Sequence, residues 1–530
     1  MDHREEVREY ASFSVNRPGI GCINTEETIR HGWRCSIFYL PSIENEPYLV
    51  TMHSATCVRG DSMTDHTRIE RDSLGEYSVP ADAWYGIQTA RAVANFPISG
   101  RRPDWDFILS HVRIKRAAAV ANHRSGKLDE TLSNAIVNAC DRILAGEYLD
   151  QFVVDRFQAG AGTSHNMNSN EVIANLANVA LGGERGVYTP INPNDHVNMG
   201  QSTNDTIPTA IRLAALAKLP RLVATVEAMA NEYVRIGKQE ADTVKSGRTH
   251  LQDAVPTTLG REFNAYAWTL RRCVERLLAA RDQLCEIGLG GSAAGTGLNT
   301  APDYAAAAAQ ELALLTGEAI RPAADLAGQM QSMADIQQIS SAIRDLALEL
   351  NRISNDMRLL ASGPRTGIGE ILLPPVQPGS SIMPGKVNPV MFEMLNQVCY
   401  QVLGQDAAIA AMTQAGQLEL NVMMPALGSA LFDAMDWLSN AINAATVRNL
   451  KGLKVDRERC REFLHASVGL ATLLNDHIGY AAAAEIAKES ERTQRPVRDI
   501  VAARGLMSGE DFDTLVLQAA RDGIIKTPHA

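Results

Sequence analysis

The sequence predicts a mainly α-helical protein whose central part is a bundle of long helices. Two segments, 219–236 and 259–277, carry apolar residues at every third or fourth position over five or more turns. Such one-faced apolar stripes are typical of helices that bury their stripes against one another. Aromatic residues make up only 5% of the chain while alanine is abundant, which favours close packing of helices through small side chains. Few strand-like alternations interrupt the pattern, so bundling is the expected architecture.

The apolar stripes also predict which side chains form the core. The first stripe consists of Leu219, Leu222, Val226, Met229, Tyr233 and Ile236, and the second of Leu259, Phe263, Tyr266, Leu270, Val274 and Leu277. Residues 325–362 and 391–450 show the same one-faced apolar pattern. Further core candidates in them are Leu346, Leu348, Ile353 and Leu359.

The chain divides into four expected regions. Residues 1–64 mix Arg, Glu, Cys, Pro and aromatics without periodicity, and we expect a poorly ordered N-terminal extension, its first 62 residues being an added segment or an upstream mis-assigned start. Residues 65–203 are expected to form a mostly helical N-terminal domain. Residues 204–458 form the central bundle, and residues 459–530 a small C-terminal domain with helical segments at 480–493 and 496–504.

Composition excludes several classes of protein. The net charge of −11 argues against a general nucleic-acid binder, and it requires a local positive site for any anionic ligand. The eight cysteines form no C-x-x-C pair and no Cys/His cluster, so neither a zinc site nor a disulfide framework is indicated. No apolar run approaches the roughly 18 residues that span a bilayer, and no secretory signal opens the chain, so the cytoplasm is the expected location.

The most informative stretch is the segment 379–389, Gly-Ser-Ser-Ile-Met-Pro-Gly-Lys-Val-Asn-Pro. Its glycines and prolines exclude a regular helix or strand and predict a shaped loop that carries reactive groups. A structural turn would explain the glycines and prolines. It would not explain why Lys386 and Asn388 stand together in so constrained a segment.

Two common motifs do not fit this loop. A phosphate-binding P-loop has Gly, four residues and then Gly-Lys-Ser/Thr, whereas Pro384 occupies the second glycine position and Val387 follows the lysine. A nucleophile elbow reads Gly-x-Ser-x-Gly, whereas Gly379 is followed directly by Ser380 and Ile382 is not glycine.

A second glycine-rich stretch, 288–298, resembles a dinucleotide-binding loop only superficially. It follows a predicted helix rather than a strand, and no βαβ unit surrounds it. We expect a flexible loop between helices, close to a site.

Four polar clusters stand beside the predicted helices: 160–168, 198–205, 246–253 and the loop 379–389. Ser, Thr and Asn cap helices well, so capping alone can explain any one cluster. Four together indicate a shared site. Its hydroxyls, amides, helix N-termini, one Lys and one His suit a small dicarboxylate.

Such a site can remove a proton next to a carboxylate. The doubly charged aci-carboxylate that results requires strong stabilisation. A serine in a tight glycine-rich loop can be the base if backbone N–H groups and a cation such as Lys386 lower the pKa of its hydroxyl. The sequence contains no evident metal site and no nucleophile–base–acid triad.

These clusters, in this order, resemble the aspartase/fumarase superfamily. The Gly-Lys-Val-Asn-Pro form of the loop is typical of the branch that holds aspartases and class II fumarases, and the similarity runs from about Thr67 to Thr527. The resemblance implies a three-domain subunit, a homotetramer with a twenty-helix core, and active sites built from three chains. It also implies a reversible anti elimination to fumarate without an organic cofactor, and it leaves activation by a divalent metal open.

The resemblance further implies a role for each matching residue. Ser380 resembles the catalytic base, and Lys386 and Asn388 would bind the substrate α-carboxylate and stabilise the aci-carboxylate. The other carboxylate would be held by Thr163, Ser202, Thr203 and Ser381. Asn204, Thr249 and the catalytic His250 would surround the leaving group. Met383 would line the pocket, and Glu393 would sit near His250.

Within this branch the residues favour deamination of L-aspartate to fumarate and ammonia. Gly-Ala-Gly-Thr-Ser at 160–164, Arg-Ile-Glu-Arg-Asp at 68–72 and the run 416–423 resemble aspartases, whereas fumarases typically read Gly-Ser-Gly-Thr-Gln at the first of these. Met424 departs from both, because aspartases usually have Glu there and fumarases Lys. A class II fumarase acting on malate and a non-catalytic helical scaffold are the alternatives. The intact set of polar residues argues against the scaffold.

Overall fold

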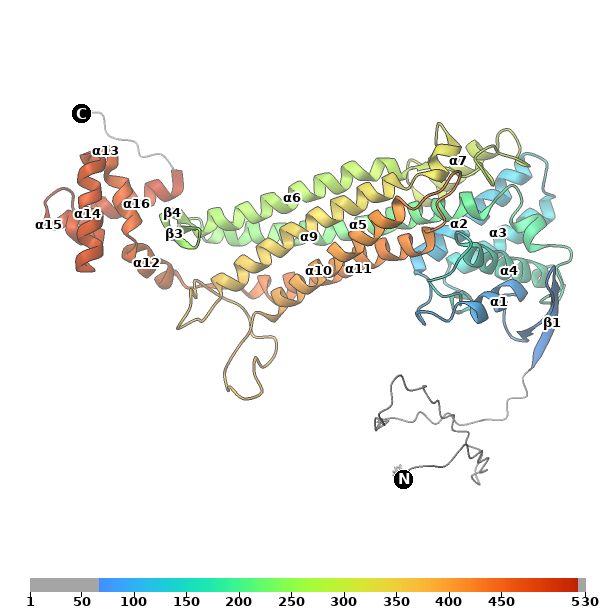
Figure 1. Cartoon of the computed structure of the whole chain (residues 1–530), viewed down its shortest axis with the longest axis horizontal. Helices are drawn as coiled ribbons and strands as arrows, with labels where there is room; N and C mark the ends of the chain where they lie inside the picture. Colours follow the sequence, from blue (N-terminus) through green and yellow to red (C-terminus); the bar gives the residue numbers. More distant parts are fainter. Residues whose placement is uncertain (1–65, 523–530) are drawn as a thin grey trace, which may run out of the picture. The chain divides into compact units, whose positions relative to one another are not determined.

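Helices make up most of the computed structural model, which describes residues 66–522 (Figure 1). The expected N-terminal extension therefore lies outside the described residues. The predicted mainly α-helical class is confirmed. The N-terminal helices are α1 (Ile87–Asn95), α2 (Trp105–Arg124), α3 (Glu130–Leu144) and α4 (Thr163–Ala180), with short turns of helix at Leu149–Gln151 and Pro193–Val197.

Five long helices form the central bundle. They are α5 (Thr203–Gln239), α6 (Leu259–Leu284), α9 (Ala334–Leu360), α10 (Val390–Thr413) and α11 (Met424–Arg448). Helix α5 packs on α6 and α11, and α9 packs on α6 and α10. The shorter α7 (Tyr304–Thr316) and α8 (Leu326–Gln331) lie between α6 and α9 in the chain, and α7 packs against α2.

The bundle core confirms the two predicted stripes. All twelve stripe positions on α5 and α6 are buried. On α9 the prediction is right for Leu346 and Ile353 and wrong for Leu348 and Leu359, which are 48% and 38% exposed. The helical period explains the error, because residues two positions apart point to nearly opposite sides of a helix. The buried stripe of α9 instead continues through Leu350, Met357 and Leu360.

Side-chain caps fix where the helices begin. Asp104 accepts hydrogen bonds from the backbone N–H groups of residues 106 and 107 at the start of α2, and Asp129 does the same for α3. Ser202 and Asp205 form a reciprocal capping box at the start of α5. Thr258 caps α6. Each cap satisfies N–H groups that have no partner within the helix.

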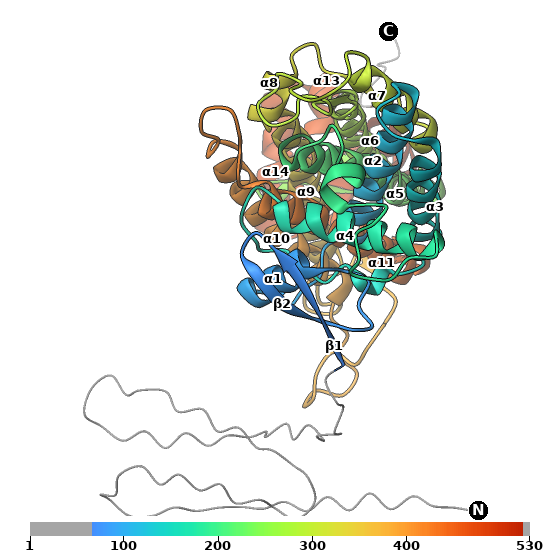
Figure 2. The ribbon, with the colours of Figure 1, turned by 90° about the vertical axis from the view of Figure 1, so that its right-hand side faces the viewer.

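The N-terminal helices have a core of their own, built from apolar residues of α2, α3 and α4. Strands β1 (Thr67–Asp72) and β2 (Gly75–Pro80) pair with each other and lie beside α1 (Figure 2). Glu171 of α4 is buried and ties α1 in place, because its carboxylate accepts from the N–H groups of Gly86, Gln88 and Thr89. Helix α2 also contributes to the bundle core, so the expected domain boundary at 203/204 stays a prediction.

Short strands form four two-stranded sheets in the described residues, which the sequence did not predict. The longest pair is the antiparallel hairpin of β3 (Val244–Thr249) and β4 (Gln252–Thr258), between α5 and α6. The other pairs are β5 (Glu286–Ile287) with β6 (Arg321–Pro322), and β7 (Ile371–Leu372) with β8 (Lys454–Val455). Cluster 246–253 was expected beside a helix and instead forms this hairpin.

The C-terminal helices pack on the β3–β4 hairpin through α12 and α16. They are α12 (Arg457–Ala466), α13 (Asn475–Ile478), α14 (Tyr480–Thr493), α15 (Val497–Ala503) and α16 (Gly509–Asp522), with short turns of helix at Leu450–Gly452 and Val468–Leu474. The predicted segments 480–493 and 496–504 correspond to α14 and α15. None of the helices within residues 66–522 is long and apolar enough to cross a membrane.

The glycine-rich stretch 288–298 follows a two-residue strand, so the expectation that only a helix precedes it was wrong. Strand β5 pairs in parallel with β6 across α7. The glycines serve close packing: a Cβ at Gly290 would lie 2.6 Å from Ala305 Cβ, and one at Gly295 would collide with the backbone of Ala327. Because Ala305 and Ala327 occupy the space beside these glycines, no room remains there for a phosphate group.

Replacing Leu346 with Ala is expected to lower the free energy of unfolding by about 2–5 kcal/mol, because it leaves a cavity in the bundle core. Leu348→Ala is the matched control on the same helix and is expected to cost less than about 1 kcal/mol. Chemical denaturation of both variants measures the difference. Equal losses would contradict the described packing of α9.

Candidate active site

The polar clusters 160–168 and 198–205 lie at one end of α5, and cluster 246–253 lies at the other end. Thr203 begins this helix, and β3 starts five residues after its last residue, Gln239. Its 37 residues span about 55 Å at 1.5 Å per residue. Figure 1 accordingly shows β3 and β4 at the end of the bundle away from α4 and α7. Thr163 and Thr203 therefore lie about one helix length from Thr249 and His250 of the same chain.

At the first end, the N-termini of α4 and α5 converge. Thr163 opens α4 after Gly162, whose φ of 99° lies in the left-handed region. The Thr163 hydroxyl donates to Gly160 O (2.7 Å) and lies 3.3 Å from Thr203 Oγ1. Thr163 is exposed, and Ser202, Thr203 and Asn204 are partly exposed. Two helix N-termini with exposed hydroxyls form a favourable site for an anion.

A buried lysine holds this end together. Lys115 of α2 is fully buried, and its ammonium donates to Asn166 Oδ1 (2.6 Å), Asn198 Oδ1 (2.9 Å) and Gln201 Oε1 (3.0 Å). With its oxygen held by Lys115, the amide of Asn166 presents Nδ2 to Thr203 Oγ1 at 3.3 Å. Burial lowers the pKa of Lys115 to about 7, partly opposed by the nearby Asp205. This network positions both predicted threonines.

The stretch 288–298 is anchored at the same end. Asp205 accepts from the N–H of Ser202 (2.9 Å) with one oxygen, and from Gly290 (3.1 Å) and Ser292 (2.9 Å) with the other. Burial raises the pKa of Asp205 to about 6, against the lowering effect of these bonds. The Asn204 amide donates to Ala293 O (2.9 Å). The loop thus lies at the site, as expected, but it is held rather than free.

At the other end, Thr249 and His250 occupy the tip of the β3–β4 hairpin. Thr249 pairs with Gln252, so His250 and Leu251 form a two-residue turn with φ of 57° and 58°. That geometry normally selects Asn or Gly, so the two side chains here carry backbone strain. Thr249 and His250 are exposed and Leu251 is 70% exposed. The strained turn presents His250 outward from the chain.

The loop 379–389 closes on itself ahead of α10. Gly379 N donates to Lys386 O (2.9 Å), and the Asn388 amide donates to Gly379 O (2.7 Å). Ser380 Oγ accepts from the N–H groups of Ile382 (3.2 Å) and Met383 (3.1 Å). Donors aimed at an oxygen favour its charged form. Of the two features that a serine base would need, the backbone N–H donors are present around Ser380.

The reactive side chains of the loop face outward. Ser381 and Lys386 are exposed, Met383 is 48% exposed, and Ser380 and Asn388 are partly exposed. A hollow of about 440 Å³ is lined by residues of the segment 375–387 alone. Glu393 lies in the first turn of α10. Within residues 66–522, no hydrogen bond joins Glu393 to His250. The predicted Glu393–His250 pair is therefore not formed inside one chain.

A single chain therefore brings the predicted residues together in three sets. Thr163, Ser202, Thr203 and Asn204 form the first set, Thr249 and His250 the second, and Ser380, Ser381, Met383, Lys386 and Asn388 the third. Across the described range, no group of three His, Cys, Asp or Glu side chains is arranged to hold a metal ion. Sequence reasoning missed Lys115, although one lysine among the apolar positions of an alanine-rich helix was a usable signal.

Two protein families together match most of the described chain. Residues 75–404 match the family described as Lyase, and residues 470–518 match the family described as Fumarase C C-terminus.

Similar proteins cover most of the chain. An aspartate ammonia-lyase from Bacillus sp is 45% identical over 454 residues, covering 86% of this chain and 97% of the relative. One from Pseudomonas aeruginosa is 46% identical, covering 85% and 96%. A cobalt-bound structure titled fumarate lyase:delta crystallin from Brucella melitensis is 44% identical with a TM-score of 0.84, covering 86% and 99%. A class II fumarase from Schistosoma mansoni is 33% identical with a TM-score of 0.82, also covering 86% and 99%.

Replacing Lys115 with Met is expected to destabilise the protein, and by more at high pH. In the wild type the folded lysine loses its proton near pH 7, whereas the unfolded one keeps it to about 10.5. Between these values the unfolded state binds more protons, so wild-type stability rises with pH. Lys115→Met removes that slope, and its cost is expected to grow by about 2–3 kcal/mol from about pH 7 to about pH 9.

Urea denaturation at the two pH values measures this change. Arg116→Met is the control, because that neighbouring side chain pairs with Asp141 and arginine keeps its charge over this range. A cost of Lys115→Met that is the same at both pH values would contradict the lowered pKa.

Proposed function

The chain belongs to the aspartase/fumarase superfamily of lyases, and from that membership we propose that it catalyses the reversible deamination of L-aspartate to fumarate and ammonia. The observation that carries this proposal is the identity of 42–46% to proteins named aspartate ammonia-lyase, over 84–86% of the chain. The exposed polar sets described above support the proposal, because they carry hydroxyl, amide, lysine and histidine groups that such an elimination can use.

Ser380 is the proposed general base. Its Oγ removes a proton from C3 of aspartate, and the electron pair of the C–H bond moves into the adjacent carboxylate to give an aci-carboxylate. The two backbone N–H groups at 3.1–3.2 Å support this role, because they stabilise the serine alkoxide. Lys386, six residues along the same loop, adds a positive charge.

The aci-carboxylate develops on the β-carboxylate, which is bonded to the carbon that loses the proton. The resemblance assigned its stabilisation to Lys386 and Asn388, but these residues are matched to the α-carboxylate, which is one carbon further away. We assign the β-carboxylate to Thr163, Ser202, Thr203 and Ser381. The converging N-termini of α4 and α5 support this assignment, since they favour an accumulating negative charge.

The second step expels the amino group, which leaves from its protonated, ammonium form. The electron pair returns from the aci-carboxylate to form the C2–C3 double bond, the C2–N bond breaks, and ammonia leaves with the pair of that bond. Asn204, Thr249 and His250 surround the leaving group in this proposal, Met383 covers the pocket, and Glu393 pairs with His250. The outward presentation of His250 by a strained turn supports a role outside its own chain.

We propose a homotetramer in which each active site is shared between subunits. The roughly 55 Å of α5 keep the first and second sets apart in one chain. A second copy running in the opposite direction brings one chain's Thr203 to another chain's His250. Apolar side chains exposed on the bundle support such contacts, among them Trp268 (66%) and Tyr400 (53%).

Hydration of fumarate to malate is the alternative reaction, favoured by the similarity to a class II fumarase. Met424, which departs from both branches, bears on this choice. It is fully buried beside Phe107, His165 and Phe432 at the start of α11. A side chain buried in this way does not contact a leaving group bound at the surface of its own chain.

Purified protein is expected to form fumarate from L-aspartate and not from L-malate. Ultraviolet absorbance of fumarate follows both reactions under the same conditions. Turnover of malate alone would replace the proposed activity with that of a fumarase. Absence of turnover with either substrate would support the scaffold instead.

Mixing two inactive variants tests the shared site. Ser380→Ala is expected to reduce turnover by at least about 10²-fold, because it removes the base, and Thr203→Val is expected to weaken the carboxylate site in a different chain. Unfolding the two variants together and refolding them at equal amounts restores roughly a quarter of the wild-type sites, if chains combine at random. Each variant refolded alone is the control. Activity that does not exceed the controls would contradict a site built from several chains.

A further inference from the structure

A buried group of charges lies beneath the β3–β4 hairpin. Glu370 has no exposed surface, and its two carboxylate oxygens pair with Lys245 Nζ (2.7 Å) and Arg248 Nη2 (2.8 Å). Lys245 also pairs with Glu262 Oε2 at 2.7 Å. The two positive and two negative side chains balance, which is the condition for keeping ions out of water. We call these four residues the charge node.

The pKa values agree with complete pairing. Burial alone would lower the pKa of Lys245, but Glu262 and Glu370 raise it above its ordinary value. The pKa of Arg248 is raised in the same way, chiefly by Glu370 against the effect of burial. Both cations therefore stay charged and keep the node intact over the working range of pH.

The node joins the second and third sets of polar residues. Lys245 and Arg248 belong to β3, and Thr249 and His250 follow Arg248 directly. Glu370 directly precedes β7 and lies nine residues before Gly379 of the loop. Glu370 and Arg248 are 122 residues apart in the sequence. One carboxylate thus connects the strand that carries His250 to the segment that leads to Ser380.

Helix α12 fixes the same segment from the other side. Arg459 donates to the carbonyl groups of Gly367 (3.1 Å) and Ile368 (3.1 Å), and the N–H of Asp456 donates to Glu370 O (3.0 Å). Strand β7 pairs with β8 just ahead of α12. We call the segment 367–372 the loop stem. Its backbone groups are held by β8, Asp456 and Arg459, and the side chain of Glu370 is held by the charge node.

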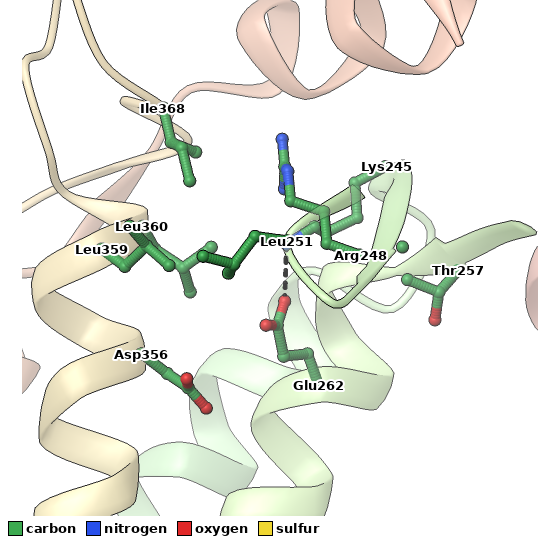
Figure 3. Close-up of a pocket in the computed structure, with 10 residues that line it drawn as sticks. Lys245, Arg248, Leu251, Thr257, Glu262, Asp356, Leu359, Leu360 and Ile368 are labelled. Atoms are coloured by element: carbon green, nitrogen blue, oxygen red, sulfur yellow. Dashed lines mark hydrogen bonds and ion pairs between the residues drawn. The ribbon is translucent and has the colours of Figure 1, made fainter. Parts of the chain in front are cut away.

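The hairpin has little other support on the side facing α9. Figure 3 shows Lys245, Arg248 and Leu251 around a hollow, with Leu359, Leu360 and Ile368 opposite and a dashed line from Lys245 to Glu262. The volume of this hollow is 340 Å³. Because open space separates Leu251 from α9, the ion pairs to Glu370 are the polar connection between hairpin and loop stem.

We propose that Glu370 is a positioning residue that couples the Thr249–His250 hairpin to the stem of the 379–389 loop. Its catalytic consequence rests on the proposed function, whereas the mechanical coupling does not. Loss of the carboxylate leaves Lys245 and Arg248 with one counter-charge between them, so the hairpin and the loop stem separate and each fluctuates on its own. Turnover then falls because catalytic groups lose their alignment.

Glu370→Gln tests this coupling in the full-length protein. Amide hydrogen exchange is expected to become about tenfold faster in both 246–253 and 379–389. On L-aspartate, kcat is expected to fall about 10- to 100-fold with a smaller change in KM. The matched control is Glu240→Gln, which removes a carboxylate that binds Arg457 of α12 but does not touch the loop stem. It is expected to leave both segments and kcat unchanged.

Each result decides the proposal. Unchanged exchange in either segment overturns the coupling, and faster exchange in both segments with unchanged kcat overturns the positioning role. If the wild type is inactive on aspartate, the proposed function fails, and the exchange experiment alone decides the coupling.

If Glu370→Gln does not fold, Arg248→Met replaces it, because Arg248 lies at the edge of the node with 17% of its side chain exposed. Arg248→Lys, which keeps the charge, is then expected to restore slow exchange in both segments, and failure to do so counts against the proposal.

Discussion

The uninterrupted length of α5 is the constraint on which the rest of this structure depends. A helix that begins at Ser202–Thr203 with a capping box and ends beside β3 places two polar groups at a fixed separation of about 55 Å. No side-chain movement closes such a gap. If a small dicarboxylate binds to both groups, as proposed, a second chain has to run in the opposite direction. The length of α5 is therefore the physical reason why the proposed catalysis depends on assembly.

Local positive charge offsets the repulsion between the negatively charged chain and an anionic ligand. With a net charge of −11, the protein repels a dianion at long range. The N-termini of α4 and α5 oppose this with partial positive charge that needs no ionisable group. Lys115 lies behind them, buried, and by binding Oδ1 of Asn166 it directs the Asn166 amide toward Thr203. Neutral hydroxyls and amides can bind both the substrate and a more highly charged intermediate without a change of protonation.

The sequence predicted what depends on local periodicity and missed what depends on distant contacts. Apolar residues at three- and four-residue intervals identified α5 and α6 and all of their predicted core positions. The same reasoning failed at Leu348 and Leu359, because it counted leucines without following the turn of the helix. The β3–β4 hairpin was missed because its tip, His250–Leu251, lacks the usual Asn or Gly. Glu370 was missed because its partners lie more than a hundred residues away, which no local pattern reveals.

In the proposed mechanism the loop 379–389 removes the proton, and this task is the same for aspartate and malate because both have an acidic hydrogen beside a carboxylate. The choice between ammonia and water must therefore be made at the other carbon, where Asn204, Thr249 and His250 are proposed to meet. Asn204 is held by the carbonyl of Ala293, whereas Thr249 and His250 stand on an exposed hairpin. Selection of the leaving group then depends on how firmly that hairpin is held. In this proposal the charge node beneath the hairpin, rather than the buried Met424, sets the position of those groups.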